Sequence, residues 1–391
     1  MTDTCVIVPT IREYECVREY VANAREHGHA DRLFFLLVTE EFCDTDDMEA
    51  MLDDLGVEGA VFDGSDREDW YETNGMAEYG HVVPAASHAE TSFGLLYMWA
   101  GDFEFGFFID DDTLPHDTDY FGGHYDNLAR SGEVTEVSSP ERWVNVLYEN
   151  VEEHGLYPRG YPYAAMAADE EETTVTLDGG EVVASQGLWT NVPDLDAVRI
   201  LMDGDLEGLA QTRTTADDYE DDFLVAEGDY TTVCSMNLAF RRRVVPAFYQ
   251  LPMDDNEWDV GRFDDIWSGV FLKRAADAAG DKVLTGSPLC EHNKAPRPTF
   301  DDLNNEVPAL ELNEHVWEVA DAVEVGASGP EAATYRATFE ALAEAFAEGD
   351  FDEWTNGDFL NFVGEHMRDW LAALDALDES ARATAEVAAD D

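Results

Sequence analysis

The sequence predicts an α/β protein with a mainly parallel sheet that is covered by helices on both faces and followed by a C-terminal helical appendage. Three observations predict this class. Continuous apolar runs alternate with helix-spaced apolar residues through the first third of the chain. Two apolar stripes with a 3.6-residue period lie near its end. Finally, 45% of the 391 residues are hydrophobic and 12% are aromatic, which is enough for a large core.

The individual elements follow from these patterns in chain order. Apolar runs predict strands at 6–8, 33–38, 57–62, 105–109, 234–240 and 282–285. Helical spacing predicts helices at 12–27, 48–55, 91–100, 332–347 and 359–377, and a further helix that ends at Lys273. The acidic segment 168–180 predicts a hairpin or an exposed loop. We expect residues 1–304 to form a ligand-binding domain and residues 305–391 to form a helical region packed on it.

The chain carries a very large negative charge. Its 87 acidic and 22 basic side chains give a formal net charge of −65, and only 3 of the basic residues are lysine. Repulsion would oppose every encounter with nucleic acid or an anionic membrane, so both are poor partners. We interpret the acidic residues, which run through the whole chain, as a surface adapted to concentrated salt; an ordinary acidic protein is the alternative. The Debye length is about 3 Å at 1 M salt, so we expect the fold to tighten in molar KCl.

Three further features indicate where the protein works. No stretch of 18 apolar residues exists, so we expect no membrane span. The N-terminus lacks the basic region and apolar core of a signal peptide. The five cysteines show neither disulfide nor zinc spacing. We therefore expect reduced thiols and a cytoplasmic protein, and the sequence leaves a homo-oligomer open.

Asp110, Asp111 and Asp112 directly follow the apolar strand 105–109. Ligands gather at the carboxyl ends of strands in open sheets of this class. Magnesium and manganese favour carboxylate oxygens and commonly bridge them to the phosphates of a substrate. The triplet therefore indicates a divalent-metal and nucleotide-sugar site, with a solvated acidic turn as the alternative reading, because aspartate is abundant throughout this chain.

Three segments in the middle of the chain carry candidate substrate contacts. Arg159 lies in the rigid segment PRGYPY and would fork onto a diphosphate, or else stack on its neighbouring tyrosines. Gly187 and Trp189 offer an aromatic platform for a sugar or a base, although such a tryptophan is more often part of a core. Asn237 interrupts a predicted strand, either as a ligand contact or as a satisfied buried amide.

Two later segments add acids and a histidine. Asp264 and Asp265 lie between aromatic residues just before a helix, where they either cap the helix or contact sugar hydroxyls and the reacting centre. His292 follows a predicted strand and is close in sequence to Lys294. This histidine would complete the metal site with Asp110 and Asp112, and the lysine would contact phosphate.

Together, seven blocks in order resemble the reversibly glycosylated polypeptide family, which includes the UDP-arabinopyranose mutases of plants. The matching blocks are VPTIR at 8–12, IDDD at 109–112, RGYPY at 159–163, SQGLWTNVPDLDA at 185–197, CSMNLAF at 234–240, GRFDDIWSG at 261–269 and HNKA at 292–295. The chain departs from the family pattern at Met166, where the family has a second arginine, and at 39–41. It also lacks the basic residues that the family carries between 87 and 108. The chain looks like a salt-adapted, archaeal-type member.

The resemblance implies a fold and a set of roles. The fold would be the A-type glycosyltransferase fold, with a Rossmann-like sheet in a nucleotide-sugar-binding domain over residues 1–304. Arg159 would be the arginine that becomes glycosylated, assisted by Asp264 and Asp265. Substrate contacts would include the candidates Pro9, Thr10, Arg12, Glu40, Asp110, Gly187, Trp189, Asn237 and Lys294, with Glu40 next to uracil. The metal ligands would be Asp110, Asp112 and His292, and the cofactor Mn²⁺ or Mg²⁺.

Three functions therefore compete at the level of sequence. The first is a UDP-sugar mutase that interconverts pyranose and furanose forms, with Arg159 holding the sugar covalently. The second is a metal-dependent glycosyltransferase that passes the sugar from a UDP-sugar to a protein, lipid or glycan acceptor. The third is a non-catalytic nucleotide-sugar-binding scaffold.

Overall fold

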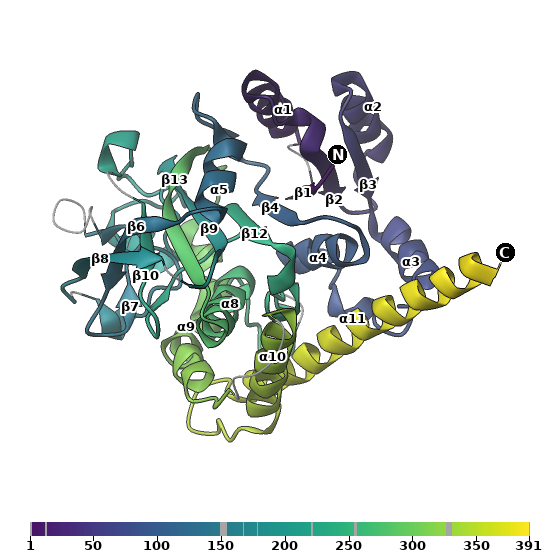
Figure 1. The fold of residues 1–391 in the computed structure, drawn as a ribbon. Helices are drawn as coiled ribbons and strands as arrows, with labels where there is room; N and C mark the ends of the chain where they lie inside the picture. Colours follow the sequence, from purple (N-terminus) through teal and green to yellow (C-terminus); the bar gives the residue numbers. More distant parts are fainter. Residues whose placement is uncertain are drawn as a thin grey trace.

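A mixed eleven-stranded sheet forms the centre of the molecule in the computed structural model, which describes residues 2–11, 14–148, 155–166, 168–177, 179–219, 222–253, 256–325 and 331–390. Its strand order is β3-β2-β1-β4-β12-β9-β13-β10-β6-β8, and β5 pairs with β13 (Figure 1). The strands are β1 (Thr4–Pro9), β2 (Leu33–Val38), β3 (Glu58–Phe62), β4 (Phe105–Ile109), β5 (Thr113–Pro115), β6 (Gly132–Ser138), β8 (Glu171–Leu177), β9 (Val182–Asn191), β10 (Phe223–Val225), β12 (Asn237–Arg241) and β13 (Lys282–His292). A separate two-stranded sheet pairs β7 (Trp143–Val144) with β11 (Tyr230–Thr231).

Helices cover both faces of this sheet. They are α1 (Cys16–His27), α2 (Thr45–Leu55), α3 (Gly64–Thr73), α4 (Thr91–Ala100), α5 (Tyr120–Leu128), α7 (Ala197–Met202), α8 (Asp264–Ala279), α9 (Thr299–Asp321), α10 (Glu331–Glu348) and α11 (Asp358–Asp390). Figure 1 shows α1 and α5 on one side of the sheet and α4, α8 and α10 on the other. The predicted α/β class is therefore confirmed.

The N-terminal part of the sheet is parallel because strand–helix units build it one after another. β1 pairs in parallel with both β2 and β4, and β2 pairs in parallel with β3. Every residue of β1 is buried, which explains its continuous apolar run. Beyond β4 the sheet becomes mixed, because β12 runs antiparallel to both β4 and β9. The parallel direction that we predicted thus holds for the first four strands, and both directions occur in the rest.

The acidic segment 168–180 is one place where the structure differs from the sequence prediction. Instead of a loop or a hairpin, residues 171–177 form β8, which pairs antiparallel with β6 at the edge of the sheet. Its alternating threonine and valine residues satisfy the period of a strand, and its charged residues remain exposed at the open edge.

The C-terminal helices contact one another and the elements that precede them in the chain. α10 and α11 contact one another, and α10 also contacts α8. Trp370 of α11 stacks on Tyr249 with 4.8 Å between the ring centroids. The predicted boundary at residue 304 falls inside α9, so one continuous helix spans it. The division into two parts remains a prediction.

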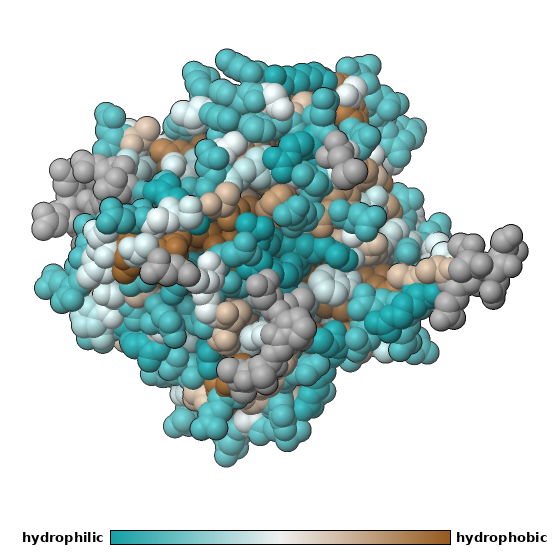
Figure 2. Space-filling view, in the orientation of Figure 1, coloured by the Kyte–Doolittle hydropathy of each residue, from teal (hydrophilic) through white to brown (hydrophobic). Residues whose placement is uncertain are grey.

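The exterior agrees with the composition. The face shown in Figure 2 is mostly hydrophilic, with apolar residues confined to a few patches. Across the stretches of chain that are described, no helix has both the length and the apolar character that crossing a bilayer requires.

Candidate active site

A cavity of about 550 Å³ opens beside the aspartates that follow β4. Most of its lining side chains are charged, namely those of His88, Asp110, Asp112, Arg159, Asp194, Arg262, Asp264, Asp265, His292, Lys294, Arg297 and Asp302. They come from segments that are far apart in the sequence. The cavity therefore lies where the sequence predicted a ligand site, at the carboxyl end of a central strand.

The predicted metal ligands lie on one side of this cavity. β5 follows the aspartates directly, and its pairing with β13 places His292 opposite Thr113. The Nδ1–H of His292 donates to the Val192 carbonyl at 2.7 Å, which leaves Nε2 facing Asp112 Oδ2 at 3.6 Å. Burial opposes the charged imidazole, but Asp112 outweighs it and raises the pKa of His292.

The donor chemistry of this side fits a hard divalent cation. Oδ1 of Asp110 is buried and forms no hydrogen bond to any described residue, although His88 Nε2 lies 3.5 Å away. Carboxylate oxygens with one imidazole suit magnesium or manganese. The anchored Nδ1 of His292 is the usual outer contact of a ligating histidine. Among the described residues, however, no three His, Cys, Asp or Glu side chains are already gathered as a metal cluster.

Arg159 lies across the cavity between two buried carboxylates. Asp265, in the first turn of α8, contacts Nη1 and Nη2 at 3.2 Å each. Asp194, which follows β9, contacts Nε and Nη2 at 3.2 Å, and Nη1 also donates to the Arg262 carbonyl. Every nitrogen of this guanidinium therefore has an acceptor, and only 12% of the side chain is exposed.

The charges around Arg159 act on one another. Burial opposes its charge, but Asp194 and Asp265 outweigh burial and raise the pKa of Arg159 well above its ordinary value. Burial also opposes ionisation of Asp194, yet Arg159 lowers the pKa of that carboxyl to about 2. For Asp265, burial dominates and its pKa is raised. One acid is thus held ionised, whereas the other has an increased affinity for a proton.

The main chain around Arg159 is held firmly. A Cβ at Gly160 would lie 2.2 Å from Cγ2 of Ile266, so only glycine lets this segment approach α8 so closely. Asn313 of α9 donates to the Gly160 carbonyl at 2.9 Å. The tyrosine-stacking alternative does not apply to Arg159, because the guanidinium over Tyr163 belongs to Arg199, at 4.4 Å.

The structure separates the two acids that the sequence grouped. Asp264 accepts from His88 Nδ1 at 2.9 Å, whereas Asp265 contacts Arg159. The other ring nitrogen of His88 lies 3.5 Å from Asp110 Oδ1. Burial lowers the pKa of His88, but Asp264 and Asp110 outweigh burial and raise it well above its ordinary value.

Lys294 is the most unusual cation of the cavity. Its Nζ is buried and has no hydrogen-bond partner among the residues that the structure describes, and burial lowers its pKa to about 8. Two neighbouring arginines both contact Asp302, whose carboxylate lies 3.3 Å from Arg262 Nη1 and 2.9 Å from Arg297 Nε. Arg262 also contacts Glu306 at 2.9 Å. This side of the cavity therefore offers positive charge to an anionic ligand.

A second cavity of about 350 Å³ adjoins the first and holds the candidates from the ends of β1 and β2. Pro9, Thr10 and Glu40 line it together with Asp111. Thr10 Oγ1 donates to Asp111 Oδ2 at 2.8 Å. Oε1 of Glu40 already accepts from the Ala86 main chain at 2.7 Å and from an arginine. The candidate Arg12 lies outside the described residues.

Three other candidates lie in the core and line neither cavity. Trp189 is 1% exposed. The side chain of Asn237 is satisfied, since Oδ1 accepts from Tyr120 and His124, and Nδ2 donates to two carbonyls. Gly187 is needed for packing, because a Cβ there would lie 2.3 Å from Asn237 Nδ2.

Several site residues were not identified from the sequence. Asp194 lies inside the matching block 185–197, so the resemblance offered a signal for it. His88, Arg297 and Asp302 stand in no motif, and only their contacts reveal them. His88 and its partner Asp264 are 176 positions apart.

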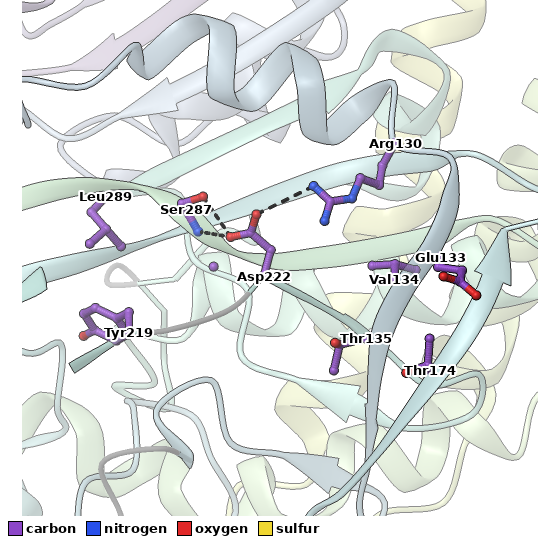
Figure 3. Close-up of a pocket in the computed structure, with 10 residues that line it drawn as sticks. Arg130, Glu133, Val134, Thr135, Thr174, Tyr219, Asp222, Ser287 and Leu289 are labelled. Atoms are coloured by element: carbon purple, nitrogen blue, oxygen red, sulfur yellow. Dashed lines mark hydrogen bonds and ion pairs between the residues drawn. The ribbon is translucent and has the colours of Figure 1, made fainter. Parts of the chain in front are cut away.

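A further cavity of about 360 Å³ lies beside the edge of the sheet formed by β6 and β8 (Figure 3). There, Asp222 accepts from the main-chain N–H and hydroxyl of Ser287 at 2.7 and 2.8 Å. Arg130 lies 3.9 Å from the same carboxylate. None of the predicted site residues lines this cavity, so we assign it no part in the chemistry.

Comparison with known proteins identifies related sequences. The model of a family described as reversibly glycosylated polypeptide matches residues 77–378. A probable UDP-arabinopyranose mutase 2 from Solanum tuberosum is 32% identical over 180 residues, which cover 46% of this chain and 43% of that protein. UDP-arabinopyranose mutase 1 from Arabidopsis thaliana is 28% identical over 243 residues, covering 61% and 60%. The chain thus spans about half the length of these relatives.

Solved structures give a more distant likeness. A mannosyltransferase from Pyrobaculum calidifontis in complex with GDP-Man and Mn²⁺ has 14% identity and a TM-score of 0.36, over 97% of this chain and 86% of that one. Glucosyl-3-phosphoglycerate synthase from Mycobacterium tuberculosis, with Mn²⁺ and UDP-glucose, has 13% identity and a TM-score of 0.35, over 82% and 79%.

Proposed function

The chain belongs to the reversibly glycosylated polypeptide family, and we propose that it is a UDP-sugar mutase that interconverts the pyranose and furanose forms of a UDP-sugar such as UDP-arabinose. One observation carries the proposal. Arg159 lies between Asp194 and Asp265 in the cavity that also contains Asp110 and Lys294. The relatives named as UDP-arabinopyranose mutases support the choice of reaction.

The diphosphate of the substrate would bind on the cationic side of the cavity. A buried ammonium group without a partner costs folding free energy. A phosphate oxygen placed beside Lys294 would remove that cost through a charge-assisted hydrogen bond. Lys294 would therefore help to hold the departing UDP close to the sugar.

Asp110, Asp112 and His292 would hold a divalent cation, Mn²⁺ or Mg²⁺. The buried Oδ1 of Asp110, which forms no hydrogen bond to the described residues, and the anchored ring of His292 support this assignment. When bound, the ion would act as a Lewis acid that neutralises charge on the departing diphosphate.

The covalent step would use Arg159 and Asp265. A guanidinium is a poor nucleophile while it is protonated. Asp265, with its raised pKa, would take a proton from Nη1 or Nη2 of Arg159. The nitrogen would then bond to the anomeric carbon as the bond from that carbon to the UDP oxygen breaks, with the electron pair leaving on UDP. Asp194 would stay ionised and hold the arginine in place.

Holding the sugar on nitrogen prevents its loss to water. The ring oxygen would leave the anomeric carbon and take up a proton, and another hydroxyl of the sugar would lose its proton and close on the same carbon. The UDP oxygen would then return and displace the arginine nitrogen, which recovers its proton from Asp265. The reaction consumes no other reagent.

Incubation with UDP-arabinopyranose and Mn²⁺ or Mg²⁺ in molar KCl tests this function. Chromatography should show the furanose form without any added acceptor. Mass spectrometry of the protein should show one pentose retained at Arg159. Failure to form the furanose under these conditions, with UDP binding intact, would overturn the mutase proposal.

One observation favours a second candidate, a glycosyltransferase that acts on a separate acceptor. Because every nitrogen of Arg159 already has an acceptor, this side chain can also be read as a brace for the site. Turnover of the UDP-sugar that appears only after a protein, lipid or glycan acceptor is added would identify this activity.

A further inference from the structure

We propose that Arg297 is a further substrate-binding residue that clasps the diphosphate of the nucleotide sugar where the two cavities meet. The inference rests on the proposed function only in taking a nucleoside diphosphate sugar as the ligand. It concerns how that ligand is bound and says nothing about the reaction that follows.

Arg297 lies where the two cavities meet. His88 and Arg297 line both the cavity that contains Arg159 and the cavity that contains Thr10. A nucleotide sugar has its nucleoside at one end and its sugar at the other, so a ligand that fills both cavities must place its phosphates at their junction. Arg297 is therefore next to the phosphates, whichever sugar is bound.

The side chain is oriented by fixed contacts. The main-chain N–H of Arg297 donates to the Glu207 carbonyl at 2.8 Å. Its Nε donates to Asp302 at 2.9 Å, and this carboxylate is itself only 5% exposed. Asp302 is in turn held by Arg262 at 3.3 Å. Asp302 is thus a positioning residue: it orients the guanidinium through Nε and leaves the two terminal nitrogens, Nη1 and Nη2, uncontacted.

The far end is available for a ligand. Within the part of the chain that the structure describes, the two terminal nitrogens of Arg297 donate to no protein acceptor, and 45% of the side chain is exposed. A planar guanidinium with two free N–H₂ groups matches two phosphate oxygens in a bidentate manner. Arg159, with an acceptor at every nitrogen, offers no such free edge to a phosphate.

The surrounding charges support an anionic ligand at this point. Arg262 and Lys294 line the same cavity as Arg297. Burial and the positive charge of Arg262 lower the pKa of Arg297, so its charge is less well compensated than that of an ordinary surface arginine. A diphosphate beside these three cations would relieve that imbalance, and a monophosphate would relieve less of it.

The test compares UDP with UMP as the titrated ligands, by calorimetry in molar KCl. We expect Arg297→Gln to weaken UDP binding by about 10- to 100-fold, as for loss of a charge-assisted pair. The same substitution should weaken binding of UMP, which has one phosphate, by a factor at least about fivefold smaller. Arg297→Lys keeps the positive charge but not the two-pronged guanidinium, so its affinity for UDP should lie between those of the wild type and Arg297→Gln. Arg368→Gln removes a comparably exposed arginine from α11 and should change neither affinity.

Two results would overturn the inference. One is a UDP affinity that Arg297→Gln leaves unchanged, and the other is an equal loss for UDP and UMP. An unchanged thermal midpoint of Arg297→Gln would show that the variant is folded. Since the readout is binding, wild-type protein that binds UDP but forms no furanose would refute the mutase alone. Furanose formation with unchanged UDP binding by Arg297→Gln would refute the role of Arg297 alone.

Discussion

Two buried arginines of this protein each lie between two carboxylates, but they are held differently. Arg159 contacts Asp194 and Asp265 at 3.2 Å, with an acceptor at every nitrogen. Arg67 of α3 contacts Glu40 at 3.2 Å but reaches Glu90 only at 3.7 Å, and it also donates to the Thr39 carbonyl. Within the described ranges, Oε2 of Glu90 has no hydrogen-bond partner.

The electrostatics of the two clusters are alike. Burial opposes ionisation of Glu40, yet its contacts to Glu90, Ala86 and Arg67 lower its pKa. Burial and the hydrogen bond to Glu40 raise the pKa of Glu90 to about 9. Asp194 and Asp265 are divided in the same way, with one pKa lowered and one raised. An arginine between two unequal acids is therefore no sign of catalysis by itself.

The difference lies in what surrounds each cluster. Arg159 shares its cavity with Asp110, Asp112 and Lys294, which suit a metal ion and a diphosphate. Arg67 instead joins the end of β2 to α3 and α4, and it lines a separate cavity of about 760 Å³ that contains none of these three residues. Under the proposed function, the same arrangement of charges would thus form a reaction centre at Arg159 and only join elements of the fold at Arg67.

Replacing each arginine with methionine tests this difference and should give the largest effect. Both changes leave two buried acids without their cation, so the free energy of unfolding should fall by about 3–5 kcal/mol in each variant. Only Arg159→Met removes the proposed nucleophile, so we expect its kcat to fall by about 10³-fold. Arg67→Met should keep kcat within about tenfold. Chemical denaturation and the furanose assay, both in molar KCl, measure the two effects.

A triple variant separates stability from activity at Arg159. Arg159→Met combined with Asp194→Asn and Asp265→Asn removes the unpaired charges, so it should recover most of the lost stability but none of the activity. Full mutase activity of Arg159→Met would disprove the covalent role. An equal loss of kcat in Arg67→Met would remove the distinction between the two clusters.

Lys294 differs from both arginines, because its buried Nζ has no hydrogen-bond partner in the described part of the chain. We expect Lys294→Met to weaken UDP binding by about 10- to 100-fold, the effect of one charge-assisted hydrogen bond. Loss of a buried, unsatisfied ammonium should leave the ligand-free protein at least as stable as the wild type. Calorimetry with UDP and thermal unfolding without ligand measure the two effects. A loss of stability without a loss of affinity would assign Lys294 to the fold alone.

The first third of the fold was predictable from the sequence because its strands are continuously apolar. The runs at 33–38 and 105–109 coincide with β2 and β4, and the helix predicted at 91–100 coincides with α4. The acidic segment 168–180 misled the prediction, because its strand lies at an edge where charged side chains reach solvent. In that segment, the alternation of side chains with a period of two predicts the strand better than the acidic composition does.

Local context or resemblance marked Asp110, Arg159, Asp265 and His292 in the sequence, and the structure brings these four candidates to one cavity. Site residues were not predictable where a role depends on a contact between distant segments. The pairing of Asp264 with His88 is such a contact, and no local pattern encodes it. The converse holds for Trp189, which occupies a matching block but points into the core.

The smallest expected effect is a pH dependence of the free energy of unfolding, which arises from Glu90 beside Arg67. An unfolded glutamate titrates near about 4.3, whereas in the folded protein the pKa of Glu90 is about 9. Between these values the folded state binds more protons, so this residue makes the wild type less stable as pH rises. Glu90→Gln removes that dependence. Its stability relative to wild type should therefore increase from pH 6 to pH 7, by up to about 1.4 kcal/mol. Glu181→Gln is the control, at a site away from this cluster: because its hydrogen bond to Arg243 lowers the pKa of Glu181, its contribution is complete above its unfolded value, and the difference from wild type should stay flat over that interval. Chemical denaturation at the two pH values measures both differences, and a flat difference for Glu90→Gln would show that Glu90 is ionised beside Arg67, as Asp194 is beside Arg159.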